Sequence, residues 1–163
     1  MTEHDRHIRP LVREDMPALK QVIEGMELFP SEMLDEMANG FLGGGETAEF
    51  WLTYDDGNGP VALAYCSPER MTDGTWNLLL IAVDPRRHGQ RLGAALMTHV
   101  ERRLAEQGER ILLVETSGLP AFERTRGFYH HIGYHEEARI RDYYQAGEDK
   151  IVFRKALSGI ERG

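Results

Sequence analysis

Residues 81–97 constrain the fold of this chain more than any other segment does. The apolar run 76–83 that leads into them has the length of a buried strand and is too short to span a membrane. Pro85 ends this run, because proline lacks the amide donor that a central strand needs. Gly89 and Gly93 then bracket a basic stretch, after which apolar residues recur at helical spacing. The segment therefore predicts a buried strand, a basic turn and an amphipathic helix.

A turn of this kind is suited to binding an anion. The first amides of a helix have no intrahelical partners and the helix dipole adds partial positive charge, so a phosphate or pyrophosphate fits there. A P-loop would require a Gly-Lys-Ser/Thr ending, whereas Gly93 is followed by Ala94 and Ala95. A dinucleotide-binding fold would require G-x-G-x-x-G, of which only Gly89 and Gly93 are present. An ordinary strand-to-helix turn of an α/β domain is the alternative to an anion site.

The turn resembles motif A of the GNAT N-acetyltransferases. In that family a strand ending near V-D-P leads into R/Q-x-x-G-x-G/A, and the amides of the turn hold the pyrophosphate of acetyl-CoA. Here His88 stands at the Arg/Gln position and Arg91 at the first motif glycine, while Gly93 matches the last glycine. The resemblance implies acetyl-CoA as cosubstrate, bound by Ile81, Ala82, Val83, His88, Gly89, Gln90, Arg91, Leu92, Gly93 and Ala94.

Residues 128–134, which read F-Y-H-H-I-G-Y, carry a second resemblance, to the family's L-Y-x-x-x-G-F/Y. In the family this tyrosine, here Tyr129, protonates the departing thiolate of CoA. A phenol with a pKa of about 10 and a thiol with a pKa of about 8.5 are close enough for proton transfer through a hydrogen bond. The alternative is that Tyr129 packs in the core with its hydroxyl bonded to a backbone carbonyl. Phe122 and Thr125 replace the family's upstream N-x-x-A residues.

Acyl transfer to an amine also needs a base, because a protonated amine has no lone pair for attack. Glu115, which follows the predicted strand 111–114, is the candidate, and a solvated acid at a strand end is the alternative. Asn77 and Glu137 are weaker candidates, since Asn77 cannot take a proton and Glu137 belongs to an acidic pair that we expect to be exposed. The resemblance implies that a backbone N–H within residues 80–83 stabilises the oxyanion.

The order of predicted elements is strand, two helices, three strands, helix, strand, helix and two strands, which is the GNAT order. The resemblance therefore implies an α/β fold with an α+β-like, twisted, mixed sheet of about six to seven strands flanked by about four helices. We expect one acyl-CoA N-acyltransferase domain over residues 1–163, with Asp15 as the N-cap of the first helix. The predicted strands are 8–12, 49–54, 61–66, 76–83, 111–114, 134–144 and 150–155.

Composition excludes several classes of partner. The 163 residues carry a net charge of −8, which argues against nucleic-acid binding and is compatible with a cationic acceptor. A single cysteine, Cys66, excludes an internal disulfide and indicates a reducing compartment, and we expect it to be a buried thiol. The N-terminus has no apolar signal core and no segment reaches transmembrane length, so we expect a cytoplasmic protein without a membrane partner. The seven histidines are not spaced as metal ligands, so we expect no metal ion.

The C-terminal segment 138–149 resembles the end of the ribosomal-protein N-terminal alanine acetyltransferases, which carry a similar R-x-x-Y-Y and then E-D. The alternative is a hairpin edge that uses tyrosines for strand propensity. The leading hypothesis is an acetyl-CoA-dependent N-acetyltransferase in which the amine of a small molecule or peptide attacks the thioester directly. A non-catalytic acyl-CoA-binding or interaction module with the same fold is the competing hypothesis, and either protein could form a homodimer.

Overall fold

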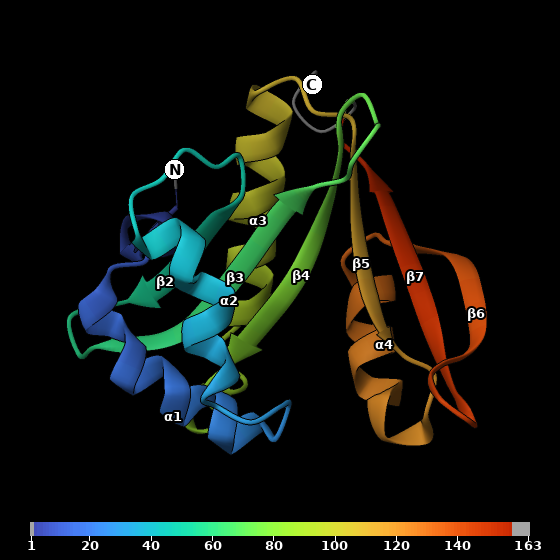
Figure 1. Cartoon of the computed structure of the whole chain (residues 1–163), viewed down its shortest axis with the longest axis horizontal. Coiled ribbons are helices and arrows are strands. Elements are labelled where there is room, and N and C mark those ends of the chain that lie inside the picture. Colours follow the sequence, from blue (N-terminus) through green and yellow to red (C-terminus); the bar gives the residue numbers. More distant parts are fainter. Residues whose placement is uncertain (1, 158–163) are drawn as a thin grey trace. The chain divides into compact units, whose positions relative to one another are not determined.

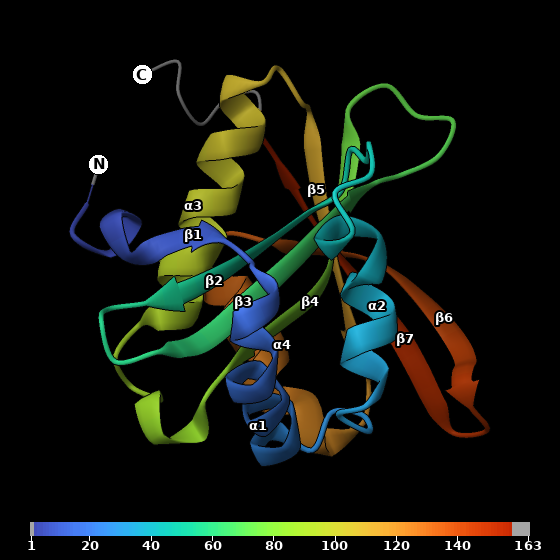
Figure 2. The same cartoon turned by 60° about the vertical axis from the view of Figure 1, so that its left-hand side comes forward.

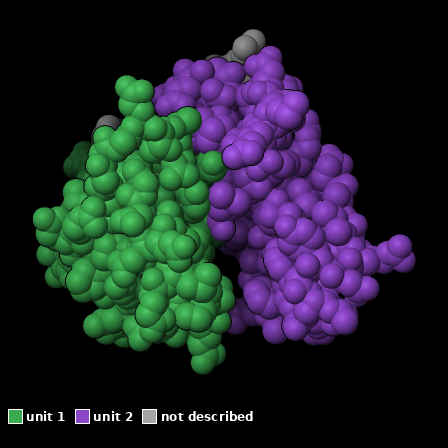
Figure 3. All heavy atoms as spheres, viewed as in Figure 1, with its two compact units in different colours: residues 1–67, 80–100 green, residues 68–79, 101–163 purple. Residues whose placement is uncertain are grey.

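The computed structural model of the protein describes residues 2–157, and the chain forms two compact units. Unit 1 comprises Met1–Ser67 and Leu80–Val100, and unit 2 comprises Pro68–Leu79 and Glu101–Gly163. Figure 3 distinguishes the two units by colour. The expectation of a single domain over residues 1–163 stays a prediction, and Met1 and residues 158–163 lie outside the described part.

Seven strands and four α-helices make up the regular structure of residues 2–157 (Figure 1). The strands are β1 (Ile8–Pro10), β2 (Phe50–Asp55), β3 (Pro60–Pro68), β4 (Thr75–Val83), β5 (Ile111–Ser117), β6 (His135–Gln145) and β7 (Glu148–Ala156). The helices are α1 (Met16–Met26), α2 (Met33–Leu42), α3 (Leu92–Glu106) and α4 (Glu123–His131). In the described chain every helix falls short of the length and apolarity that a membrane span requires.

The strands form one mixed sheet in the order β1-β2-β3-β4-β5-β7-β6. β4 and β5 pair in parallel, as a strand–helix–strand connection requires, whereas β1 with β2, β2 with β3, β5 with β7 and β6 with β7 are antiparallel. The predicted mixed α/β architecture is therefore confirmed. β1 is an edge strand, as Pro10 predicted, because proline cannot donate to a second neighbour.

In unit 1, α1 and α2 lie on one side of β2 and β3 (Figure 2). Pro17 is in the first turn of α1, where its missing amide donor costs little. Trp51 of β2 is fully buried, and its ring stacks on Tyr65 with 4.1 Å between the ring centroids. The apolar cluster between helices and strands consists of Leu11, Met16, Leu19, Val22, Ile23, Leu34, Ala38, Trp51, Leu63, Leu80 and Ala82.

Asp15 is the N-cap residue of α1, as predicted, but its side chain makes no capping hydrogen bond with the helix. Its carboxylate instead accepts a hydrogen bond from the Val12 amide at 2.9 Å and two from the Arg9 guanidinium at 2.8 and 2.9 Å. Arg9 also donates to Asp55 at 3.0 Å. A bidentate guanidinium competes better for a carboxylate than helix amides do, because both groups are charged. The buried Asp15 therefore fastens β1 and β2 to the start of α1.

In unit 2, α4 packs on one face of the sheet (Figure 1). Tyr129 of α4 contacts Phe153 of β7, with 5.6 Å between the ring centroids, and Tyr134 at 6.0 Å. The Tyr134 hydroxyl donates to the Glu101 carboxylate at 2.6 Å, and Lys155 binds the other oxygen of this carboxylate at 3.0 Å. These contacts join α4, β7 and the end of α3 within unit 2.

β5 continues through Ser117, so the predicted end of this strand at Val114 is wrong. The register with β7 runs from Ile111 opposite Ala156 to Ser117 opposite Lys150. Backbone pairing with β7 thus extends past the point at which the continuous apolar run ends. The predicted final hairpin is confirmed as β6 and β7, and all eleven residues of β6 are exposed.

Asp15→Asn should destabilise the protein by about 2 kcal/mol at pH 7, because it removes the charge of a buried carboxylate that accepts hydrogen bonds from Arg9 and Val12. Burial alone would raise the pKa of Asp15, but the hydrogen bonds from Arg9 and Val12 outweigh burial and lower it. A lowered pKa gives stability that is present above the ordinary aspartate pKa of about 3.9 and is lost as the pH falls through the lower folded value. Urea unfolding of both proteins should therefore show a difference that shrinks below about pH 4.

Asp35→Asn is the matched control, since Asp35 is half exposed and pairs with Lys20 at the surface. We expect it to change the free energy of unfolding by less than about 0.5 kcal/mol. Equal effects of the two substitutions would contradict the structural role of Asp15.

Candidate active site

The predicted cofactor-binding turn lies wholly in unit 1, directly after β4. Asp84 is buried, and its amide donates to the Val61 carbonyl at 2.8 Å, which ties the end of β4 to the start of β3. The Asp84 carboxylate accepts from the Arg86 amide at 2.9 Å and caps the short 3-10 turn Pro85–Arg87. The hydrogen bond to the Arg86 side chain is the main reason that the pKa of Asp84 is lowered, against the effect of burial. Asp84 is therefore ionised, and its hydrogen bonds fix the connection between β4 and the turn.

Side chains within the turn hold its backbone in place. Arg87 donates to Asp56 at 2.8 Å and to the Gln90 side chain at 2.7 Å. The His88 ring nitrogen Nε2 lies 3.0 Å from the Val83 carbonyl oxygen. His88 and Gln90 thus have partners in unit 1 that shape the turn, and a role for them in binding acetyl-CoA stays a prediction.

Arg91 has a left-handed backbone, with φ of 62°, and Gly89 has φ of 84°. The left-handed region favours glycine, and in other residues it costs about 1–2 kcal/mol. Arg91 therefore keeps the backbone conformation that a glycine would adopt most easily, at the position where the family carries a glycine.

α3 begins at Leu92, directly after this left-handed residue. The first intrahelical bond recorded at this end runs from the Ala95 amide to the Arg91 carbonyl at 3.0 Å. The amides of Leu92, Gly93 and Ala94 precede it, and helix geometry leaves such amides without intrahelical partners. Leu92 and Leu96 are buried and orient this end of the helix. The turn therefore has the amides, the dipole and the nearby basic residues that an anion requires.

Tyr129 lies in unit 2 and is 5% exposed. Its ring is enclosed by Phe128, Tyr134 and Phe153. Burial raises the pKa of Tyr129 to about 12, so the hydroxyl is protonated at neutral pH. Within residues 2–157 no hydrogen bond fixes this hydroxyl, in contrast to the hydroxyl of Tyr134, which donates to Glu101. The backbone-bonded core tyrosine that was the alternative is therefore not the observed arrangement.

Glu115 is a strand residue opposite Val152 of β7, and it is not the freely solvated acid of a strand end. One carboxylate oxygen, Oε1, lies 3.0 Å from Nζ of Lys150, and the other accepts a hydrogen bond from Nδ2 of Asn77 at 2.9 Å. The buried Asn77 is thus a partner of Glu115. Glu137 has a side chain that is 57% exposed and lies 3.9 Å from Arg154, as expected for a solvated surface acid.

The side chains of Tyr129 and Glu115 lie on opposite faces of the sheet in unit 2. Glu115 pairs with Val152, so its side chain shares the face of Val152. Tyr129 packs on Phe153, the next residue of β7, whose side chain points to the other face. The structure therefore brings Glu115 together with Asn77 and separates both from the Tyr129 ring.

Three further polar side chains lie near Glu115: Lys150 and Glu69, which the sequence did not indicate, and Tyr143 of the segment 138–149. Asn77 also donates to Glu69 at 3.2 Å, and Lys150 lies under the ring of Tyr143. Alternation along β7 could have suggested Lys150, because Ile151 and Phe153 occupy the core face and leave residue 150 on the other one. Its contact with Glu115 depends on the register of two strands, which sequence alone does not provide.

Cys66 is buried and forms no disulfide, as expected of a structural thiol. Over the described part of the chain, no group of three or more His, Cys, Asp or Glu side chains could hold a metal ion. Arg126 of α4 donates to the carbonyls of Ser117 and Leu119 at 2.7 and 2.9 Å and so joins the end of β5 to α4.

Comparison with known proteins identifies the family. The acetyltransferase (GNAT) domain matches residues 46–136, more than half of the chain, and the protein belongs to this family. No curated protein matches the chain by sequence.

Solved structures of the same fold agree with this assignment. A protein from Desulfovibrio desulfuricans that is described as a GNAT-family acetyltransferase has 29% sequence identity and a TM-score of 0.86, with 93% of this chain and 98% of that chain covered. The ribosomal-protein-S18-alanine N-acetyltransferase of Escherichia coli has 25% identity and a TM-score of 0.71, with 93% of each chain covered. An aminoglycoside 6′-N-acetyltransferase complexed with coenzyme A shares the fold at 16% identity and a TM-score of 0.72, with 92% of this chain and 96% of that chain covered.

If the turn holds the pyrophosphate of acetyl-CoA, this ligand should raise the melting temperature. At a ligand concentration of about 100 Kd the native state gains about 2.7 kcal/mol, which corresponds to several degrees. Gly93→Asp should abolish the shift, because it adds bulk and negative charge in the first turn of α3. Gly93→Asn adds similar bulk without charge and should retain part of the shift. A full shift in a folded Gly93→Asp protein would place the anion site elsewhere.

Arg91→Gly should leave the Kd for acetyl-CoA within a few-fold of the original, or weaken it modestly in a salt-dependent way, because glycine favours the same left-handed backbone. Arg91→Val should weaken binding strongly, since a β-branched residue is a poor fit at positive φ. Isothermal titration at two salt concentrations measures both effects. Complete loss of binding in Arg91→Gly would mean that the Arg91 side chain, and not its backbone, is the main contact.

Proposed function

We propose that the protein is an N-acetyltransferase that moves the acetyl group of acetyl-CoA to a primary amine by direct attack. The observation that carries this proposal is the turn after β4, where Arg91 has a left-handed backbone and α3 begins with amides that helix geometry leaves without intrahelical partners. We infer that this turn binds the pyrophosphate through the amides of residues 89–94. Ile81, Ala82 and Val83 would contact the pantetheine arm, and one amide of residues 80–83 would stabilise the oxyanion.

The amine nitrogen would form a bond to the thioester carbon, and the carbon–sulfur bond would break as the tetrahedral intermediate collapses. The thiolate that leaves needs a proton, for which Tyr129 is the proposed donor. The amine loses a proton, for which Glu115 is the proposed acceptor, directly or through water.

The raised pKa of Tyr129 limits how it can act. A pKa of about 12 lies about 3.5 pKa units above that of a free thiol, which corresponds to about 5 kcal/mol for complete proton transfer. Burial also raises the pKa of the CoA thiol, which narrows the difference between this pKa and that of Tyr129. We therefore expect Tyr129 to hydrogen-bond the sulfur while the carbon–sulfur bond lengthens and to release its proton late.

The ion pair with Lys150 limits how Glu115 can accept a proton. The Lys150 ammonium lies 3.0 Å from Oε1 of the Glu115 carboxylate, so an amine reaches this oxygen only if Lys150 moves or a water bridges the two. Glu115 is nevertheless a quarter exposed, so water can reach it. We therefore propose that Glu115 accepts the proton of the amine after this amine has displaced Lys150, or that a water between them transfers the proton.

The acceptor is proposed from the relatives as a class. The E. coli relative is named for the alanine of a ribosomal protein, and another structure of this fold for an aminoglycoside, and both acceptors offer amines. We propose a small amine or a peptide N-terminus in the cytoplasm, in agreement with the net charge of −8 and the single cysteine. A panel of alanine-ending peptides, aminoglycosides and polyamines, screened for CoA thiol release, tests this directly. No release with any amine, despite acetyl-CoA binding, would favour the non-catalytic acyl-CoA-binding module.

Tyr129→Phe should lower kcat by about a hundredfold or more, the usual contribution of general acid catalysis, and leave the Kd for acetyl-CoA nearly unchanged. The ring and its packing on Phe153 are retained, so only the hydroxyl is lost. Tyr134→Phe is the control, because it removes a nearby hydroxyl that donates to Glu101. It should reduce stability but not kcat. Full activity of Tyr129→Phe would remove this residue from the mechanism, and equal losses of binding and rate would make it a packing residue.

A further inference from the structure

Lys150 is 9% exposed, although lysine is rarely buried without a partner. Its Nζ lies 3.0 Å from Oε1 of Glu115 and 4.1 Å from the ring centroid of Tyr143. All three residues belong to unit 2. A carboxylate beside an aromatic face is the combination by which proteins recognise an ammonium group. Here the ammonium group beside Glu115 and Tyr143 is that of Lys150, a residue of the same chain.

The register of the strands explains how Lys150 reaches this position. Lys150 lies opposite Ser117 of β5 on one side and Ile140 of β6 on the other. Glu115 is two residues from Ser117 along β5, so its side chain is on the same face as that of Lys150. The flexible side chain of Lys150 reaches the Glu115 carboxylate, while the Lys150 backbone is paired with both neighbouring strands.

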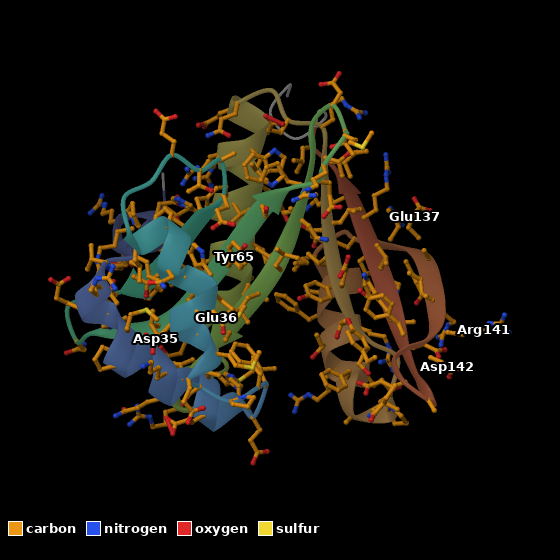
Figure 4. All side chains as sticks on the ribbon, viewed as in Figure 1. Asp35, Glu36, Tyr65, Glu137, Arg141 and Asp142 are labelled. Atoms are coloured by element: carbon orange, nitrogen blue, oxygen red, sulfur yellow. The ribbon has the colours of Figure 1, made fainter. Side chains whose placement is uncertain are left out.

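A bulge in β6 brings the ring of Tyr143 over this ammonium. The pairing of β6 with β7 shifts between Ile140 and Gln145, and Asp142 within this stretch has φ of 56°. The Asp142 amide donates to Asp149 at 3.0 Å, and its carboxylate accepts from the Gly147 amide at 2.8 Å. Figure 4 labels Asp142 in β6, near the turn of the hairpin. The hairpin therefore fixes the bulge by its own hydrogen bonds.

Asn77 provides an independent sign that this site accepts a ligand. The residue is 3% exposed, and its Nδ2 donates to Glu115 at 2.9 Å and to Glu69 at 3.2 Å. Two carboxylate acceptors fix the orientation of the amide, since the reverse orientation would direct its oxygen at both carboxylates. Its Oδ1 is buried and has no hydrogen-bond partner in the described chain. A buried acceptor beside Glu115 can therefore receive an N–H from a bound group.

The charge state of Lys150 agrees with its role as an ammonium. Burial alone would lower the pKa of Lys150, but its hydrogen bond and charge interaction with Glu115 outweigh burial and raise it. Lys150 is therefore positively charged at neutral pH, as an incoming alkylamine would be.

We propose that Glu115 and Tyr143, with Oδ1 of Asn77, form a binding site for a primary ammonium group, and that Lys150 is its internal occupant. An external alkylammonium then binds by displacing the Lys150 side chain, whose four-carbon stem rotates away while β7 stays paired. The identification of this ligand with the acetyl acceptor rests on the proposed function, but the binding site does not. The arrangement selects amines over alcohols, because only an ammonium can replace the charge of Lys150.

Because an external amine must first displace the Lys150 side chain, its apparent affinity for the site is lower than its intrinsic affinity. When only a small fraction of molecules has an open site, the apparent Kd is the intrinsic Kd divided by that fraction. If Lys150 occupies the site about 90–99% of the time, its removal strengthens amine binding about ten- to a hundredfold.

The test is a titration with n-butylammonium, followed by the NMR signals of the Tyr143 ring, without acetyl-CoA or turnover. Lys150→Met keeps most of the aliphatic stem and removes the charge, and it should bind n-butylammonium at least about tenfold more tightly than the original protein. Lys155→Met is the matched control, since Lys155 also pairs with a glutamate, Glu101, at 3.0 Å on the same strand. It should bind like the original protein, and Lys150→Met combined with Glu115→Gln should lose the gain.

An unchanged Kd in a folded Lys150→Met protein would overturn the proposal, as would an equal gain in Lys155→Met. If Lys150→Met does not fold, the original protein still decides the question. Saturating n-butylammonium should move the ε-CH2 signal of Lys150 to the position of an exposed lysine. A Lys150 signal that stays in place while n-butylammonium binds at Tyr143 would also refute displacement. Butylammonium binding without acetyl transfer to any amine would leave this site intact and refute only the proposed function.

Discussion

The path of the backbone after β4 depends on the hydrogen bonds of Asp84, and the rest of the cofactor turn follows from it. This buried carboxylate caps the 3-10 turn, while the Asp84 amide binds β3. The chain then enters a left-handed conformation at Arg91 and starts α3 with three amides that precede the first intrahelical bond. We propose that the anion binds to these main-chain amides, which would explain why an arginine can stand at the position where the family has a glycine.

Unit 2 uses the two faces of its sheet differently. The face covered by α4 is apolar and encloses Tyr129, and this burial raises the pKa of the phenol to about 12. The other face carries Glu115 in a polar set with Asn77 and Lys150. The residues that we propose as proton donor and proton acceptor therefore lie in different surroundings.

Much of the fold could be predicted from the sequence, because apolar periodicity and turn residues are local signals. The strand and helix around Gly93, the edge position of β1 and the final hairpin are all observed. Two features differ from expectation because of contacts outside the helix or strand concerned: the Asp15 side chain binds Arg9 and not its helix, and β5 continues to Ser117 because β7 pairs with it. The contacts of Glu115 with Asn77 and Lys150 depend on strand register, which periodicity does not encode.

We propose that main-chain amides of the turn after β4 hold the pyrophosphate of acetyl-CoA. Titration of the 15N-labelled protein with CoA, followed by amide NMR, tests this proposal, since a hydrogen bond to a phosphate oxygen shifts the signal of the donor amide strongly. We expect the largest shifts at Gly89–Ala94, with Gly93 and Ala94 among them. Saturating CoA binding that leaves these amides unshifted, with the large shifts elsewhere in the chain, would show that the pyrophosphate binds at another site.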